Sequence, residues 1–306
     1  MSAPDWSRLL SLDLPALLCG SALALAGSSA GTLLVLRRQG LFADGLSHAV
    51  LPGVVLAYLW SGSRAPGALL VGGLCAGLLL AAATRATARR VPLDPSAVLG
   101  ALYPLFFALG LLLLESQSGG DLDLAPSHVL FGQLEQLAWR APADLAGWLD
   151  PDSYRRLPWL FWQSFLLCGA SLLWLALAGR ALFVAGFDPV GARLLGLRPA
   201  LFESVTLVAC AAIAVGLFQV GGVVLALTLL LVPAACARLL TDRYRVQFRL
   251  AALLGIALVW AGYGLAVFLL PALLGTQSLS AAGGIASSGG ALLLLLSRVG
   301  PRRARR

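Results

Sequence analysis

Residues 200–240 read ALFESVTLVACAAIAVGLFQVGGVVLALTLLLVPAACARLL. No charged residue stands between Glu203 and Arg238, and the stretch is about twice the 20 apolar residues that one helical crossing of a bilayer needs. A polar break at 219–222 divides it into two apolar runs. We therefore predict two membrane-spanning helices joined by a tight turn, at 200–219 and 222–240.

The rest of the 306-residue chain has the same character. Hydrophobic residues make up 59% of it, charged residues 12%, and the mean hydropathy is +0.88. Soluble domains carry about 25% charged residues, so this composition excludes an ordinary soluble enzyme or nucleic-acid-binding domain. In lipid every backbone polar group must be paired within its own segment, which predicts an all-α fold. Seven further predicted spans bring the total to about nine, at 12–36, 42–60, 66–84, 96–114, 158–179, 250–270 and 277–297.

The distribution of charge predicts how the chain is oriented. All 22 basic residues are arginines; 12 of them fall at alternate junctions between the predicted spans, and five more lie in the tail after the last span. Because positive residues stay in the cytoplasm, this alternation predicts an external N-terminus and a cytoplasmic C-terminus. The absence of lysine also excludes a P-loop nucleotide site, which requires one.

We expect a single membrane domain, 1–306, with three notable polar regions. The external segment is 115–157, where Trp139 suits the membrane–water boundary, and Asp13 is also expected outside. A cytoplasmic loop spans 180–199. The basic tail at 298–306 indicates an anchor for anionic lipid rather than a nucleic-acid site.

Charged groups inside a span are functional candidates because lipid solvates them poorly. Asp44 and His48 are four residues apart, so a helix places both on one face. A carboxylate and an imidazole that converge suit Zn²⁺ or Mn²⁺. Two structural alternatives remain open, in which Asp44 caps the second span and His48 is a hydrogen-bonded core residue. One turn later Pro52 weakens the helical hydrogen bonds and predicts a kink, as Pro233 does in the seventh span.

The cytoplasmic loop contains a second candidate. Asp188 is a suitable N-cap, Pro189 a suitable first helical residue and Gly196 a suitable stop, so a short helix is predicted at about 189–195. Val190, Leu194 and Leu195 give it an apolar face that suits docking to a partner. A plain connecting helix fits the same residues.

Two further polar residues carry weaker indications. Glu203 lies just inside the sixth span, where pairing with a nearby arginine would satisfy it. His128 belongs to the external segment, where a metal could reach it, although a single surface histidine is more often incidental.

The motifs together resemble a known family. The element from Asp44 through Ser47, His48 and Pro52 to Gly53 is similar to the signature of the permeases of zinc, manganese and iron ABC importers of bacteria. Three further segments resemble that family in order and spacing, namely Val129–Gly132, 187–197, and Gln219–Gly221 followed by Leu231–Leu240. His128 departs from the pattern, because the family more often has an apolar or aromatic residue there.

The resemblance implies a bacterial inner-membrane permease that is not itself an enzyme and holds no permanent cofactor. It would act as a homodimer, with a cytoplasmic ATPase docked on the helix near 189–195 and an extracytoplasmic protein delivering the divalent cation. Asp44 and His48 match the family's metal-path positions. The main alternative is a proton-coupled transporter that uses Asp44, His48 and Glu203 without an ATPase. A third possibility is a membrane scaffold or sensor that transports nothing.

Overall fold

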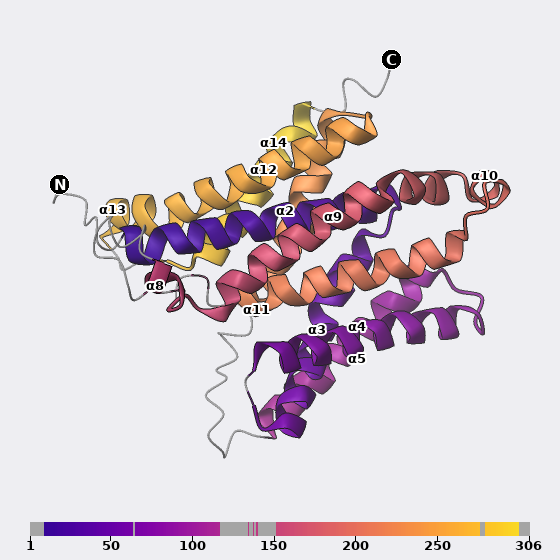
Figure 1. The fold of residues 1–306 in the computed structure, drawn as a ribbon, viewed down its shortest axis with the longest axis horizontal. Helices are drawn as coiled ribbons and strands as arrows, with labels where there is room; N and C mark the ends of the chain where they lie inside the picture. The colour runs from indigo at the N-terminus through magenta and orange to yellow at the C-terminus, as the bar shows by residue number, and fades with distance from the viewer. Residues whose placement is uncertain are drawn as a thin grey trace.

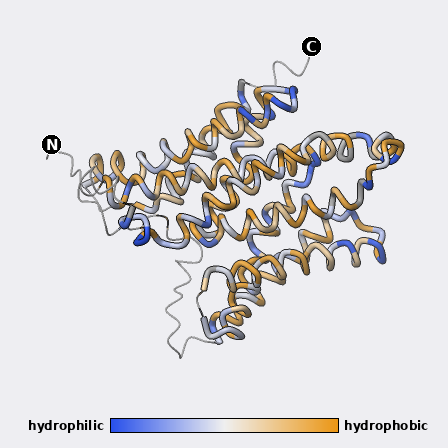
Figure 2. Tube along the Cα trace, viewed as in Figure 1, coloured by the Kyte–Doolittle hydropathy of each residue, from blue (hydrophilic) through white to orange (hydrophobic). Residues whose placement is uncertain are grey.

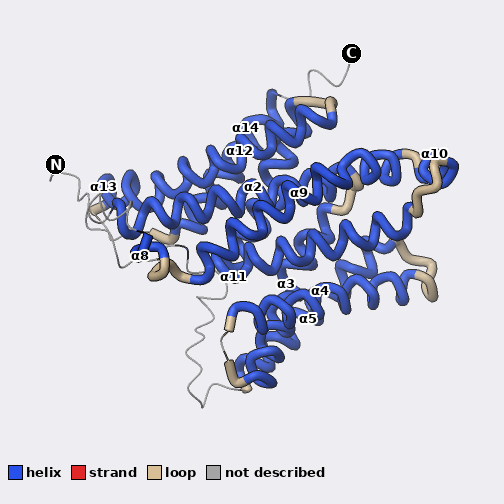
Figure 3. The backbone as a smooth tube through the Cα atoms, in the orientation of Figure 1, coloured by secondary structure: helices blue, strands red, loops and turns tan. Residues whose placement is uncertain are grey.

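The computed structural model describes residues 9–63, 65–116, 134, 137, 139, 151–275 and 279–299. Within this part of the chain the regular structure is helical throughout (Figures 1 and 3). The π-helices are η1 (Leu9–Asp13) and η3 (Leu265–Leu269). The α-helices are α2 (Leu14–Leu36), α3 (Gly40–Ser61), α4 (Pro66–Ala88), α5 (Pro95–Glu115), α8 (Pro151–Tyr154), α9 (Trp159–Phe187), α10 (Pro189–Leu194), α11 (Pro199–Leu240), α12 (Tyr244–Gly264), α13 (Leu270–Leu274) and α14 (Ala281–Val299).

Among the described residues, eight helical segments are long and apolar enough to cross a membrane. Figure 2 shows hydrophobic residues along their lengths and hydrophilic ones gathered near their ends. The prediction of an all-α polytopic membrane protein is therefore confirmed. We call the end of the bundle that carries Arg37, Arg85 and Tyr244 the arginine-rich end. The start of α3, the end of α4 and the start of α5 lie together there because their residues line one cavity. Arg37 lies close enough to Tyr244, at the start of α12, for its charge to act on the tyrosine.

α11 is a hairpin rather than one straight rod. Gly222 has φ +68° and ψ −175°, and the positive φ is a conformation that glycine adopts without steric strain. A Cβ atom placed on Gly27 would lie 3.2 Å from the Leu217 side chain and 3.0 Å from the Leu229 carbonyl oxygen. In a straight helix these two leucines would be about 18 Å apart along the axis. The chain therefore reverses direction within the predicted turn. The structure has eight membrane-crossing helical segments among its described residues, against nine predicted spans, because the α11 hairpin contains two of the predicted spans.

Side chains also hold the turn in place. The amide of Gln163 in α9 donates a hydrogen bond of 2.5 Å to the amide oxygen of Gln219. The backbone break of α11 lies at Gly222, whereas Pro233 stands further along inside the helix. Because Pro233 has no N–H, it leaves the Leu229 carbonyl without its helical donor, and that carbonyl is the one packed against α2.

α2 forms the centre of the larger helix group. It packs against α9, α11 and α12, and most of its residues are buried, with a half-buried stripe at Leu18, Ser21 and Leu25; this accounts for its largely apolar sequence. Its glycines let backbones approach closely, as small residues do in membrane helix packing. At Gly31 a Cβ atom would overlap the Leu230 carbonyl of α11.

α3, α4 and α5 form a second group, which reaches the rest of the molecule mainly through α11 (Figure 1). α3 and α4 cross at Gly53 and Gly72, where either glycine's Cβ would collide with the other helix. On the opposite side a Cβ on Gly110 of α5 would lie 2.9 Å from Pro52. α3 is thus clamped between two helices, and this clamp fixes the direction in which its polar side chains point.

Two residues of the predicted external side are buried in the protein. Trp139 is 1% exposed, and its indole N–H donates to the Ser153 carbonyl at 2.9 Å. Asp13 is 3% exposed, and its carboxylate accepts a 2.7 Å hydrogen bond from the Tyr263 hydroxyl. Both residues are buried because parts of the external segment and of η1 pack onto the bundle.

The glycine contacts predict an asymmetric response to alanine. Gly31→Ala should destabilise the protein by about 1–3 kcal/mol, because the new methyl group must displace the α11 backbone. Gly169→Ala is the matched control, since nothing lies within 4 Å of its Cβ position and alanine favours the helix. Unfolding in detergent micelles measures both changes. Equal stabilities for the two variants would contradict the close packing of α2 on α11.

Candidate functional site

α3 brings Asp44 and His48 together. The helix begins at Gly40, after Gln39, so Asp44 stands in its second turn and does not cap it. The capping alternative is therefore excluded. Asp44 and His48 follow one another on the same face, as their spacing predicts.

The geometry of the pair suits a metal ion. His48 Nε2 lies 3.4 Å from Asp44 Oδ1, which is long for a charge-assisted hydrogen bond. Two ligands on a tetrahedral Zn²⁺ at about 2.0–2.1 Å would be about 3.3–3.4 Å apart. The two side chains are 24% and 23% exposed, so an ion could reach them without a change in the fold.

α5 fixes the orientation of the imidazole. Its ring stacks on Tyr103 at 5.5 Å and meets the edge of Phe107 at 4.9 Å. The Tyr103 hydroxyl lies close enough to Asp44 to interact with its carboxylate. His48 Nδ1 is buried and has no hydrogen-bond partner, so the neighbour to which the imidazole can bond is Asp44, on the Nε2 side.

The pair is an incomplete ligand set. Among the described residues, no three His, Cys, Asp or Glu side chains lie close enough together to hold an ion. One further acceptor is nearby, because Pro52 has no N–H to donate to the carbonyl of His48. A four-coordinate ion would still need ligands beyond these described residues.

The short helix α10 has the predicted form. The Asp188 carboxylate accepts a 2.8 Å hydrogen bond from the N–H of Gly191, and Gly196 ends the segment with φ +76°. Three apolar side chains of this segment face outward although they lie outside the spanning helices. They are Val190 (68% exposed), Leu194 (85%) and Leu195 (71%). Figure 1 shows α10 projecting beyond the neighbouring helix ends.

Several predicted site residues lie outside the described part of the chain. His128 and the segment 129–132 are among them, as is the tail beyond Val299. Glu203 and Pro189 are placed in helices, but their side chains are not described. Sequence reasoning missed Tyr103 and Phe107, because two aromatics in an apolar span carry no sign of the helix they face.

Comparisons with known proteins agree with this arrangement. The model of the ABC 3 transport family matches residues 11–140 and 160–282. The chain is 30% identical over 239 residues to the Bacillus subtilis manganese transport system membrane protein MntD, covering 78% of each chain. It is 31% identical over 222 residues to the Treponema pallidum zinc transport system membrane protein TroD, covering 72% of this chain and 58% of that one.

A solved structure shares the fold. PsaBC from Streptococcus pneumoniae in complex with Fab aligns with a TM-score of 0.76 at 20% identity, over 99% of this chain and 98% of the other. The family consists of permease subunits, whose ATP hydrolysis takes place on a separate subunit, and its bacterial members lie in the inner membrane. With most of its length matched by the family model, this chain belongs to the ABC 3 transport family of membrane permeases.

Proposed function

We propose that this chain forms the translocation path of an ATP-driven importer of divalent transition-metal cations. The observation that carries the proposal is the Asp44–His48 pair, an oxygen and a nitrogen ligand held 3.4 Å apart within a spanning helix. Carboxylate and imidazole together suit zinc, manganese and iron. The relatives named above for manganese and zinc transport support the same cargo.

A homodimer would complete the metal site. An ionised carboxylate facing hydrocarbon is costly, so a quarter-exposed Asp44 within a spanning helix favours cover by protein or a water-filled path. A second copy related by a two-fold axis would bring two Asp and two His to one point. That set meets the four-ligand requirement, which the described residues of a single copy do not meet.

The route of the ion follows from this site. An extracytoplasmic binding protein would release the cation to the outer face, and the two pairs would replace part of its hydration shell. The ATPase would bind α10 from the cytoplasm through Val190, Leu194 and Leu195, which no described residue of this chain covers fully. Closure of the ATPase would move α10 and shift the two copies between outward-open and inward-open states.

The alternatives are weaker in view of the family. A proton-coupled transporter would need no ATPase, and a scaffold or sensor would need no ion path. Reconstitution into liposomes separates them. Metal uptake that requires the ATPase and ATP supports the importer, whereas uptake by this chain alone under a proton gradient supports the proton-coupled transporter.

The metal pair makes a first prediction. Asp44→Asn and His48→Ala should each reduce uptake of radioactive zinc or manganese at least about 10-fold, because even the outer partners of metal ligands contribute 10–100-fold to affinity. The control is Asp242→Asn, the same chemical change in an acid that pairs with Arg238 at 3.2 Å at the arginine-rich end. Full uptake by either pair variant, with assembly intact, would remove the site from the path.

The cap of α10 makes a second prediction. Asp188→Ala removes the acceptor for the Gly191 N–H and should destabilise this short helix by about 1 kcal/mol, which weakens ATPase binding. Asp188→Asn keeps an acceptor and should bind nearly normally. Leu194→Ser should also weaken binding while the cap stays intact. Co-purification of the ATPase measures all three, and recovery at the wild-type level with both Asp188→Ala and Leu194→Ser would place the docking surface elsewhere.

A further inference from the structure

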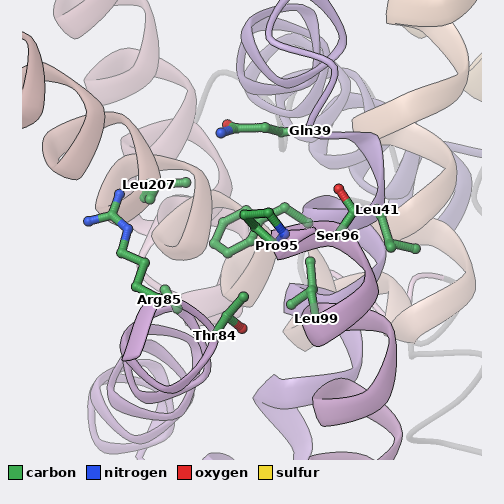
Figure 4. Close-up of a pocket in the computed structure, with 10 residues that line it drawn as sticks. Gln39, Leu41, Thr84, Arg85, Pro95, Ser96, Leu99 and Leu207 are labelled. Carbon is green, nitrogen blue, oxygen red and sulfur yellow. The ribbon is translucent and has the colours of Figure 1, made fainter. Parts of the chain in front are cut away.

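One face of α5 lies along α3 beside the Asp44–His48 pair. Leu99, Tyr103 and Phe107 are spaced four residues apart, so they follow one another on that face. Leu99 begins the row at the cavity shown in Figure 4, which opens where α3 and α5 begin. The next turn of α5 brings Tyr103 to the pair, and the turn after it brings Phe107. Two aromatic rings therefore stand in a row beside the two candidate metal ligands.

The position of this face of α5 is fixed at both ends. A Cβ atom on Gly45 of α3 would lie 3.2 Å from the Leu99 side chain, and a Cβ atom on Gly110 of α5 would lie 2.9 Å from Pro52 of α3. Because these contacts are close, α5 has little room to slide or turn against α3. The backbone of Tyr103 lies between the two contacts, so its ring reaches the pair from a fixed base.

Tyr103 contacts both members of the pair. Its ring is stacked on the His48 imidazole, with centroids 5.5 Å apart and an angle of 19° between the planes. Its hydroxyl lies close enough to Asp44 to interact with the carboxylate, and a phenol beside a carboxylate is the donor. Phe107 meets the imidazole at 76° and has no polar group to offer the carboxylate. Tyr103 can therefore restrain the rotation of both ligands at once.

His48 lacks the restraint that a metal-binding histidine usually has. Such a histidine donates its second ring N–H to a carboxylate or a carbonyl, which fixes the plane of the ring. Nδ1 of His48 is buried, and no residue in the described part of the chain forms a hydrogen bond with it. Stacking on an aromatic ring is the contact that can fix the plane of this imidazole instead.

We propose that Tyr103 is a positioning residue for the metal pair, whose ring sets the plane of His48 and whose hydroxyl sets the Asp44 carboxylate. The inference rests on the proposed function, in which the pair binds the transported cation. Ligands that are already aligned lose less rotational freedom when the ion binds, which favours affinity. Removal of the hydroxyl frees one ligand, whereas removal of the whole ring frees both.

The test measures the initial rate of zinc uptake against zinc concentration, with the assembled transporter in liposomes. Tyr103→Phe keeps the stacked ring and should raise KM for zinc about 10-fold, because outer partners of metal ligands contribute 10–100-fold to affinity. Tyr103→Leu removes both contacts and should raise KM about 100-fold, at the upper end of that range. The maximal rate should stay nearly unchanged in both, as expected for a loss of binding alone.

Tyr263→Phe is the matched control. It also removes a phenol that donates to an aspartate, since the Tyr263 hydroxyl bonds to Asp13 at 2.7 Å, but it lies outside the group formed by α3, α4 and α5. Its KM should equal that of the unmodified transporter.

The outcomes separate the role of Tyr103 from the proposed function. A normal KM for Tyr103→Phe would overturn the role of the hydroxyl, and a normal KM for Tyr103→Leu would overturn the role of the ring. A lower maximal rate at unchanged KM would reduce Tyr103 to a packing residue and overturn the proposal; if the leucine variant does not fold, the phenylalanine variant decides. Normal uptake by Asp44→Asn in the same assay would overturn the proposed function as well.

Discussion

The structure depends on keeping one ionisable pair inside an apolar membrane helix. Asp44 and His48 stand in the second and third turns of α3, where lipid would solvate neither the carboxylate nor a charged imidazole. α5 shields the pair with two aromatic rings on one side and leaves about a quarter of each side chain open. We place the second copy and the transported ion at that opening.

Close backbone contacts hold this geometry in place. α3 is clamped by Gly72 of α4 and Gly110 of α5, and the larger group is organised by α2 against the α11 hairpin. Since apolar side chains gain little by leaving lipid for protein, such small-residue contacts contribute much of what distinguishes one packing from another. The same contacts make the α3–α5 group a compact unit on α11, suited to moving as one body in the mechanism we propose, in which an ATPase acts on α10.

Hydropathy and capping signals predicted the helices well. The spans, the turn at 219–222 and the Asp188 cap followed from local patterns that lipid or a neighbouring N–H dictates. What could not be predicted is which apolar residue faces protein, because lipid and a protein core select the same side chains. The burial of Trp139 and Asp13 and the rings beside His48 depend on contacts between segments distant in the sequence, and a single sequence carries no record of them.

The most direct test of the account is a structure of the assembled transporter determined with Zn²⁺ or Mn²⁺ present. We predict one metal density between two copies of this chain, bonded at about 2.0–2.2 Å to the Asp44 carboxylate and His48 Nε2 of both. The account would be contradicted if the α3 faces of the two copies were turned toward lipid and the ion were bound by other residues.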